Sequence, residues 1–127
     1  MPNIFLKAVR KVLVSKEFSF SGAHRLPDYK GKCERFHGHT WFLRVTVRAP
    51  VQPNGVAFDF AEISRHVRKL VLPVLDHSTI NDTVPQASAE RIAQWIWQQL
   101  ASVLPLYEIR VWESPQSFVS YRGEGDA

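Results

Sequence analysis

Two histidines and the only cysteine of the chain lie within the stretch CERFHGHT, residues 33–40. Imidazole nitrogens and thiolates are the ligands that zinc prefers in proteins, and a thiolate kept off a metal can act as a base. His37 and His39 are separated by one residue, so on a β-strand both side chains point to the same face. The stretch therefore holds half of a metal site, with a cysteine that is either a ligand or a reactive group beside it.

His24 is the third candidate ligand, because it ends a predicted strand over residues 11–24 that would return antiparallel to the histidine pair. Three imidazoles with an open fourth position are typical of catalytic zinc, whereas Cys33 as a fourth ligand would close a structural site. The spacing alone fits a structural metal, a catalytic metal or no metal. The neighbouring cations Lys32 and Arg35 favour a Cys33 thiolate, which off the metal could serve as a general base.

Two further segments contain groups that could move protons or bind a ligand. Asp76 and His77, in LDHSTIND, form an acid/base pair if their side chains meet, although a capped loop accounts for them equally well. Glu113 ends an apolar strand, where it is either a ligand-binding carboxylate or a charge facing water. His66 lies in the middle of a predicted helix beside two arginines, and we expect it on the surface.

Composition limits the classes of protein that these groups can belong to. The chain has 127 residues, 45% hydrophobic and 22% charged, which predicts one folded domain over residues 1–127 with a loose tail at 123–127. A net charge of +4 is mild for a nucleic-acid-binding protein, and we expect no nucleic-acid partner. One cysteine excludes an intrachain disulfide, and neither a signal peptide nor a membrane span is apparent, so a cytoplasmic protein is expected.

Alternating apolar residues predict four strands that could position the candidate groups. The first has a slip in its alternation near Lys16, which suggests a bulge, and the last two form a hairpin through SPQ. The predicted strands cover residues 11–24, 39–49, 106–114 and 117–123.

Helical spacing predicts two helices between the strand pairs. The first starts at the cap Asp59, buries Phe60 among other apolar residues and ends at Pro73; the second covers about 88–103 and starts at Ser88. The order ββααββ predicts an α+β fold, an antiparallel four-stranded sheet with two helices on one face. The bare opposite face predicts an oligomer.

Six segments resemble, in order and spacing, the 6-pyruvoyltetrahydropterin synthase and 6-carboxytetrahydropterin synthase family. The resemblance covers about residues 15–124, and the three-residue gap between Cys33 and His37 is similar to that of the bacterial carboxy branch. The segments are FSFSGAHRLP, GKCERFHGHT, FDFAEI, LDHSTIND, SAERIAQWIWQQL and VWES.

The resemblance implies a tunnelling fold, typically assembled as a hexamer from two trimers, and a role for each candidate group. It implies zinc (Zn²⁺) on His24, His37 and His39, Cys33 as catalytic base, Asp76 with His77 as a second acid/base unit, and Glu113 as the anchor of the pterin ring. From charge we add Arg25, Lys32 and Arg122 as candidates to hold a triphosphate.

The implied activity is a zinc-dependent lyase reaction in queuosine and deazapurine biosynthesis. It converts 7,8-dihydroneopterin triphosphate to 6-carboxy-5,6,7,8-tetrahydropterin, with release of acetaldehyde and triphosphate. The alternatives are 6-pyruvoyltetrahydropterin synthase, which eliminates triphosphate, and a non-catalytic module with a structural zinc. Two departures from the family pattern touch the expected pterin pocket: Ser88 keeps a hydroxyl after an altered turn, and Ser114 replaces a threonine.

Overall fold

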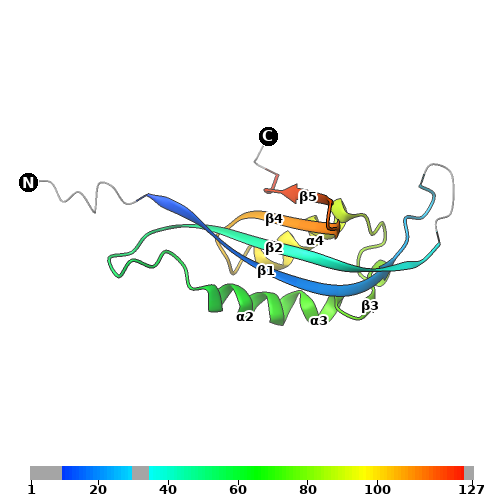
Figure 1. The fold of residues 1–127 in the computed structure, drawn as a ribbon, viewed down its shortest axis with the longest axis horizontal. Helices are drawn as coiled ribbons and strands as arrows, with labels where there is room; N and C mark the ends of the chain where they lie inside the picture. The colour runs from blue at the N-terminus through cyan, green and yellow to red at the C-terminus, as the bar shows by residue number, and fades with distance from the viewer. Residues whose placement is uncertain (1–9, 30–34, 125–127) are drawn as a thin grey trace, which may run out of the picture.

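A five-stranded sheet is the frame of the computed structural model, which describes residues 10–29 and 35–124 (Figure 1). The spatial order of the strands is β3-β1-β2-β4-β5. The strands are β1 (Lys11–His24), β2 (His37–Pro50), β3 (Ser78–Thr79), β4 (Leu106–Ser114) and β5 (Ser117–Tyr121).

The predicted four-stranded antiparallel sheet is confirmed for β1, β2, β4 and β5, including the hairpin between the last two. The fifth strand, β3, pairs in parallel with β1 through Ser78 and Thr79, so the sheet is mixed. A two-residue strand is too short to show alternation, which is why its sequence did not indicate it.

The pairing of β1 with β2 is continuous over both strands and decides which side chains share a face. Phe18 lies opposite Leu43, and Phe20 lies opposite Trp41, so apolar residues of the two strands face the same side. The predicted bulge near Lys16 is wrong, because Lys16 pairs in register with Val45. Its half-buried side chain lies on the same face as Phe18 and Phe20, where a long aliphatic stem can cover apolar surface.

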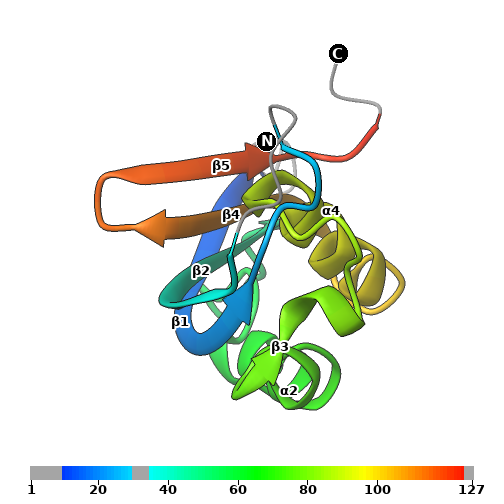
Figure 2. The same ribbon diagram turned by 90° about the vertical axis from the view of Figure 1, so that its right-hand side faces the viewer.

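Three helices and a 3₁₀ turn connect the strand pairs. Figure 2 shows α2 and α4 on the same side of the sheet, as predicted for the two helices. They are α2 (Phe60–Leu70), α3 (Leu72–Leu75), η1 (Ile80–Asp82) and α4 (Ala89–Leu100). Their buried residues, such as Ile63, Val67, Ile92 and Ile96, pack with the inward residues of β1, β2 and β4 to form the core.

The start of α2 follows the prediction and its end does not. Asp59 is the N-cap, with Oδ1 accepting the N–H of Ala61 at 2.8 Å. The helix ends at Leu70, and Pro73 lies in the first turn of α3, where its missing N–H costs nothing, so the prediction that Pro73 ends the first helix is wrong. Phe60, expected in the core, is the first helical residue and is 57% exposed.

His66 is more covered than predicted. Its side chain is 14% exposed and its Nε2 lies 3.7 Å from Oε2 of Glu62, one helical turn earlier.

Among the described residues, no helix has the length and hydrophobicity of a membrane-spanning segment. The division into one domain with a loose tail at 123–127 stays a prediction, since residues 125–127 lie outside the described part of the chain.

Gly22 lets the β3 segment approach β1. A Cβ atom on Gly22 would lie 2.7 Å from Cδ1 of the fully buried Ile80 and 3.3 Å from the carbonyl oxygen of Leu75, whereas one on Gly38 would meet nothing within 4 Å. We therefore expect Gly22→Ala to lower the free energy of unfolding by about 1–3 kcal/mol. Gly38→Ala is the matched control and should leave it unchanged or raise it by up to about 1 kcal/mol. Urea denaturation measures both, and equal stabilities would contradict this account of the packing.

Candidate functional site

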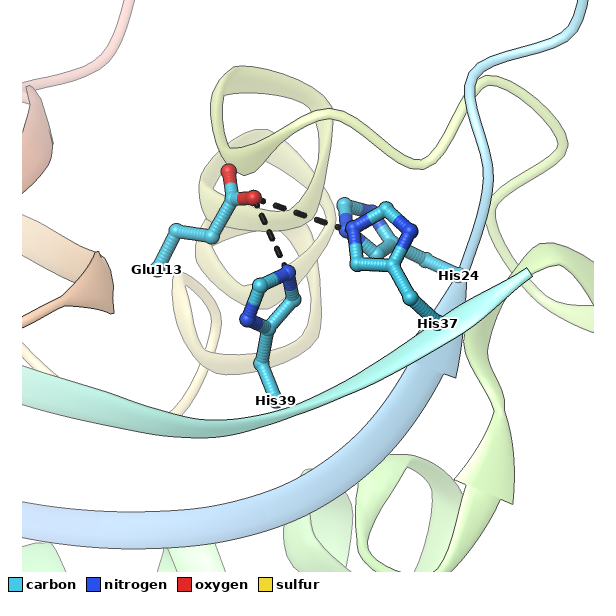
Figure 3. A group of neighbouring side chains, drawn as sticks. All are labelled: His24, His37, His39 and Glu113. Atoms are coloured by element: carbon cyan, nitrogen blue, oxygen red, sulfur yellow. Dashed lines mark hydrogen bonds and ion pairs between the residues drawn. The ribbon is translucent and has the colours of Figure 1, made fainter. Parts of the chain in front are cut away.

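Three histidines meet at one end of the β1–β2 pair (Figure 3). The register places His24 opposite His37 and Gly22 opposite His39. The ring centroids of His24 and His37 are 4.6 Å apart, as are those of His37 and His39, and those of His24 and His39 are 5.2 Å apart. The expected antiparallel return of His24 to the histidine pair is thus confirmed.

Backbone carbonyls orient two of the rings. Nδ1 of His24 lies 2.6 Å from the carbonyl oxygen of Ala87, and Nδ1 of His37 lies 3.0 Å from that of Arg35. A carbonyl oxygen only accepts hydrogen bonds, so each Nδ1 carries the proton and donates it. In the neutral rings, both Nε2 atoms then present lone pairs, which is the tautomer of a metal-binding histidine.

These two Nε2 atoms face each other at 3.1 Å. Two bare lone pairs at this distance repel each other unless a proton or a metal cation lies beside them. A cation shared by both nitrogens removes the conflict and needs no rearrangement of the carbonyl contacts. The orientation of the rings therefore favours metal binding over a purely structural histidine cluster.

Glu113 adds a carboxylate to the histidines. Its Oε1 lies 3.1 Å from Nε2 of His39 and 3.7 Å from Nε2 of His24. One ligand atom from each of the four residues falls within 4.8 Å of the others. Ligand atoms about 2.0–2.1 Å from a tetrahedral zinc ion are separated by about 3.3 Å. The donor set fits zinc in chemistry, and its separations of 3.1 and 3.7 Å are close to this value.

Trp41 contacts two of the histidines and Asn81 fixes the backbone next to His24, and the sequence did not single out either residue. The fully buried Trp41 ring lies edge-on to His24 and His39, at centroid distances of 4.8 and 5.4 Å. Asn81 fixes the chain after His24: its Oδ1 accepts the N–H of Arg25 and its Nδ2 donates to the Arg25 carbonyl, both at 2.9 Å. These contacts limit movement of the strand end.

Asp76 and His77 lie at the edge of β1 and outside the four-residue donor group. Asp76 Oδ1 accepts the N–H of Ser21 at 2.9 Å, and the N–H of His77 donates to the Ser21 carbonyl at 2.6 Å. His77 has φ 55°, a left-handed conformation that costs a non-glycine residue about 1–3 kcal/mol. Its Nε2 lies 3.7 Å from Oδ2 of Asp76, so the predicted pair does meet, with the imidazole 84% exposed.

An open pocket of about 440 Å³ lies over the ends of β1 and β2, and its lining includes His77 and, of the four donor residues, His39 alone. Its other lining residues are Ser21, Gly22, Ala23, Gly38, Thr40 and Ser78.

Two of the arginines predicted to hold a triphosphate differ in position. Arg25 directly follows His24, and its guanidinium carbon lies 5.4 Å from the centroid of the Phe36 ring. Arg122 instead pairs with the buried Glu108, Nε to Oε2 at 3.1 Å. A guanidinium already paired with a buried carboxylate is less suited to a second anion, which makes Arg122 a weaker candidate than the sequence indicated.

Ser88 has a structural partner, since its Oγ accepts the N–H of Arg91 at 3.1 Å and caps α4. It also follows Ala87, whose carbonyl orients His24, so the residue lies beside the site whether or not its hydroxyl meets a ligand. Cys33 and Lys32 lie outside the described residues, and their predicted roles are not tested by the structure.

Comparisons with known proteins agree with the fold and identify a family. The family model described as 6-pyruvoyl tetrahydropterin synthase matches residues 13–124. A 6-carboxy-5,6,7,8-tetrahydropterin synthase of Synechocystis is 37% identical over 86% of this chain and 92% of its own. One of Haemophilus influenzae is 33% identical over 86% of this chain and 97% of its own. The solved structure of Caenorhabditis elegans 6-pyruvoyl tetrahydropterin synthase superposes with a TM-score of 0.80, at 28% identity over 91% of this chain and 98% of that one.

The donor geometry predicts about one zinc ion per chain and a stabilised fold when zinc is bound. At a zinc concentration 1,000 times the dissociation constant, binding should add about 4 kcal/mol to the free energy of unfolding. His37→Ala should abolish stoichiometric zinc binding and this stabilisation. His66→Ala, which changes a histidine outside the cluster, should preserve both. Elemental analysis and thermal unfolding with and without a chelator measure these effects, and normal zinc content in His37→Ala would contradict the site.

Proposed function

We propose that the chain, which belongs to the 6-pyruvoyl tetrahydropterin synthase family, is a zinc-dependent lyase of its 6-carboxytetrahydropterin branch. It would convert 7,8-dihydroneopterin triphosphate to 6-carboxy-5,6,7,8-tetrahydropterin, releasing acetaldehyde and triphosphate, as a step toward queuosine and other deazapurines. The observation that carries the proposal is the convergence of three histidines and one carboxylate, with two of the rings oriented by backbone carbonyls so that their Nε2 atoms face each other.

The carboxy branch is supported by the names of the two bacterial relatives and by the three-residue gap between Cys33 and His37. The alternative activity, triphosphate elimination to a 6-pyruvoyl product, is supported by the name of the Caenorhabditis elegans structure. Both activities act on a pterin side chain next to a metal, so the residues of the cluster serve either reaction.

Zinc bound by His24, His37 and His39 would act as a Lewis acid that polarises the side-chain oxygens of the substrate and acidifies the neighbouring C–H bonds. The protein then has to supply bases. Cys33, four positions before His37 in the sequence, is the first proposed base. The second proposed acid/base group is His77, whose backbone is fixed by Ser21 and whose imidazole is next to the Asp76 carboxylate.

The remaining proposed contacts hold the two ends of the substrate. Glu113 would accept hydrogen bonds from the amino-pyrimidine edge of the pterin, where a carboxylate matches two donors, with Ser88 nearby. Arg25 and Lys32, and less directly Arg122, would attract the triphosphate.

We further propose a cytoplasmic homo-oligomer, a hexamer built as a dimer of trimers. Support comes from the sheet edges, because β5 pairs only with β4 among the described strands and β1 pairs with β3 through two residues alone. Long unpaired edges are sites at which strands of another chain can add. Such an assembly would also cover the exposed imidazole of His77.

The activity predicts three products from one substrate. Incubation of the zinc-loaded protein with 7,8-dihydroneopterin triphosphate should release acetaldehyde and triphosphate and yield a pterin with the mass of the 6-carboxy compound. Mass spectrometry of the products makes the measurement. The mass of the 6-pyruvoyl compound without acetaldehyde would assign the alternative activity, and zinc-loaded protein without turnover would refute both.

Replacement of Cys33 separates a base from a structural ligand. We expect Cys33→Ala to lower kcat by about 10²–10⁴-fold, the usual contribution of a general base, while zinc content and the thermal midpoint stay unchanged. Cys33→Ser keeps the size of the side chain and should lose activity as well, because a hydroxyl is a far weaker acid than a thiol. Loss of zinc and of the folded state in both variants would instead support the structural-zinc module.

A further inference from the structure

Glu113 is held differently from the three histidines of the cluster. The β2–β4 ladder reaches Trp112 and the β4–β5 ladder skips from Trp112 to Ser114, so Glu113 is the extra residue of a bulge with no partner in either ladder. Bulges re-aim side chains and weaken the local hold on the backbone. The Glu113 side chain is 38% exposed, against 2% for His24.

The histidines, in contrast, belong to a rigid frame. His24 and His37 are paired with each other in the ladder, and both rings are fixed by backbone carbonyls. His39 is packed edge-on to the buried Trp41. Three donors are therefore positioned by strand pairing and core packing, and the fourth is attached through a locally irregular segment.

The position of the Glu113 carboxylate conflicts with a single role as pterin anchor. Oε1 is 3.1 Å from the ligand nitrogen of His39, inside the donor group, whereas the two donors of an amino-pyrimidine edge need both oxygens of the carboxylate at once. A four-donor protein site is also closed, whereas catalytic zinc needs a position for a substrate atom. The two roles are compatible only if they alternate.

We propose that Glu113 is a displaceable fourth metal ligand, which closes the site in the substrate-free enzyme and leaves the metal when its carboxylate binds the ring edge of an incoming pterin. The inference rests on the proposed function, because it requires a pterin as the displacing ligand. The site would then be reactive only while a ring with the correct donor edge occupies the pocket.

The proposed displacement predicts a thermodynamic coupling between metal binding and pterin binding. A carboxylate shared between the metal and the pterin couples the two binding equilibria, so each ligand weakens the other by the same factor. Without Glu113 this coupling disappears. If Glu113 only anchors the pterin, its replacement should not change metal affinity. Metal affinity measured without pterin therefore distinguishes the two roles.

The first arm of the experiment uses metal alone. Zinc affinity is measured by competition with a chromophoric chelator for the wild type, Glu113→Gln and the matched control Glu17→Gln, whose carboxylate pairs with Arg44 away from the cluster. We expect about 10- to 100-fold weaker zinc binding in Glu113→Gln and a change below twofold in Glu17→Gln. Circular dichroism of the metal-free proteins checks that the variants fold. Equal affinity of Glu113→Gln and wild type would overturn the proposal.

The second arm uses the cobalt-substituted protein, whose visible spectrum reports the coordination of the metal. Unsubstituted pterin has the amino-pyrimidine edge but no side-chain oxygens, and lumazine has a carbonyl in place of the 2-amino group. Pterin should change the cobalt spectrum of the wild type but not that of Glu113→Gln, and lumazine should change neither.

Two outcomes of the second arm would overturn displacement in different ways. If quenching of pterin fluorescence shows binding but the cobalt spectrum does not change, Glu113 is a permanent ligand. The displacement is then wrong, while the proposal of a pterin substrate still holds. Pterin that binds to no form of the protein removes the displacement together with the proposed substrate.

Discussion

The antiparallel register of β1 and β2 is the constraint on which the rest of the site depends. Side chains alternate across a strand, so a slip of one residue between β1 and β2 would turn one strand's histidines to the opposite face. The same register pairs Phe20 with Trp41 and Phe18 with Leu43 in the core. Hydrophobic burial therefore specifies the alignment of the ligands, and the site needs no separate device to bring His24 to His37.

The orientation of the rings adds an unfavourable interaction to this otherwise favourable packing. Carbonyl acceptors on Nδ1 leave the Nε2 atoms of His24 and His37 turned toward each other at 3.1 Å, an arrangement that is unfavourable for two neutral imidazoles by themselves. The packing of Trp41 and the hydrogen bonds of Asn81 hold this arrangement in place. Binding of a cation would relieve this repulsion in the folded state, so metal affinity and folding stability would be coupled.

Much of this architecture could be predicted from the sequence, because strand alternation and the His-x-His spacing follow directly from backbone geometry. The parts that could not be predicted depend on groups that every residue carries or on tertiary context. The carbonyls of Ala87 and Arg35 have no sequence signal. Proline usually ends a helix, but Pro73 lies in the first turn of α3, because α2 has already ended at Leu70. Glu113 was expected at a pterin, and only the spatial structure brings its carboxylate to the histidines.

The contrast between a rigid histidine frame and an irregularly held carboxylate bears on how one site can be both stable and reactive. A donor group with all its members in regular strands would bind metal tightly but leave no position for a substrate. A group with three donors alone would keep an open position to water and competing anions at all times. With the displacement proposed above, a fourth donor on a bulge would separate the two demands, since the strands would retain the metal site while a local movement of one side chain opened it. The bulge in β4 gives Glu113 a position that regular pairing would not, and pairing with β5 resumes at Ser114.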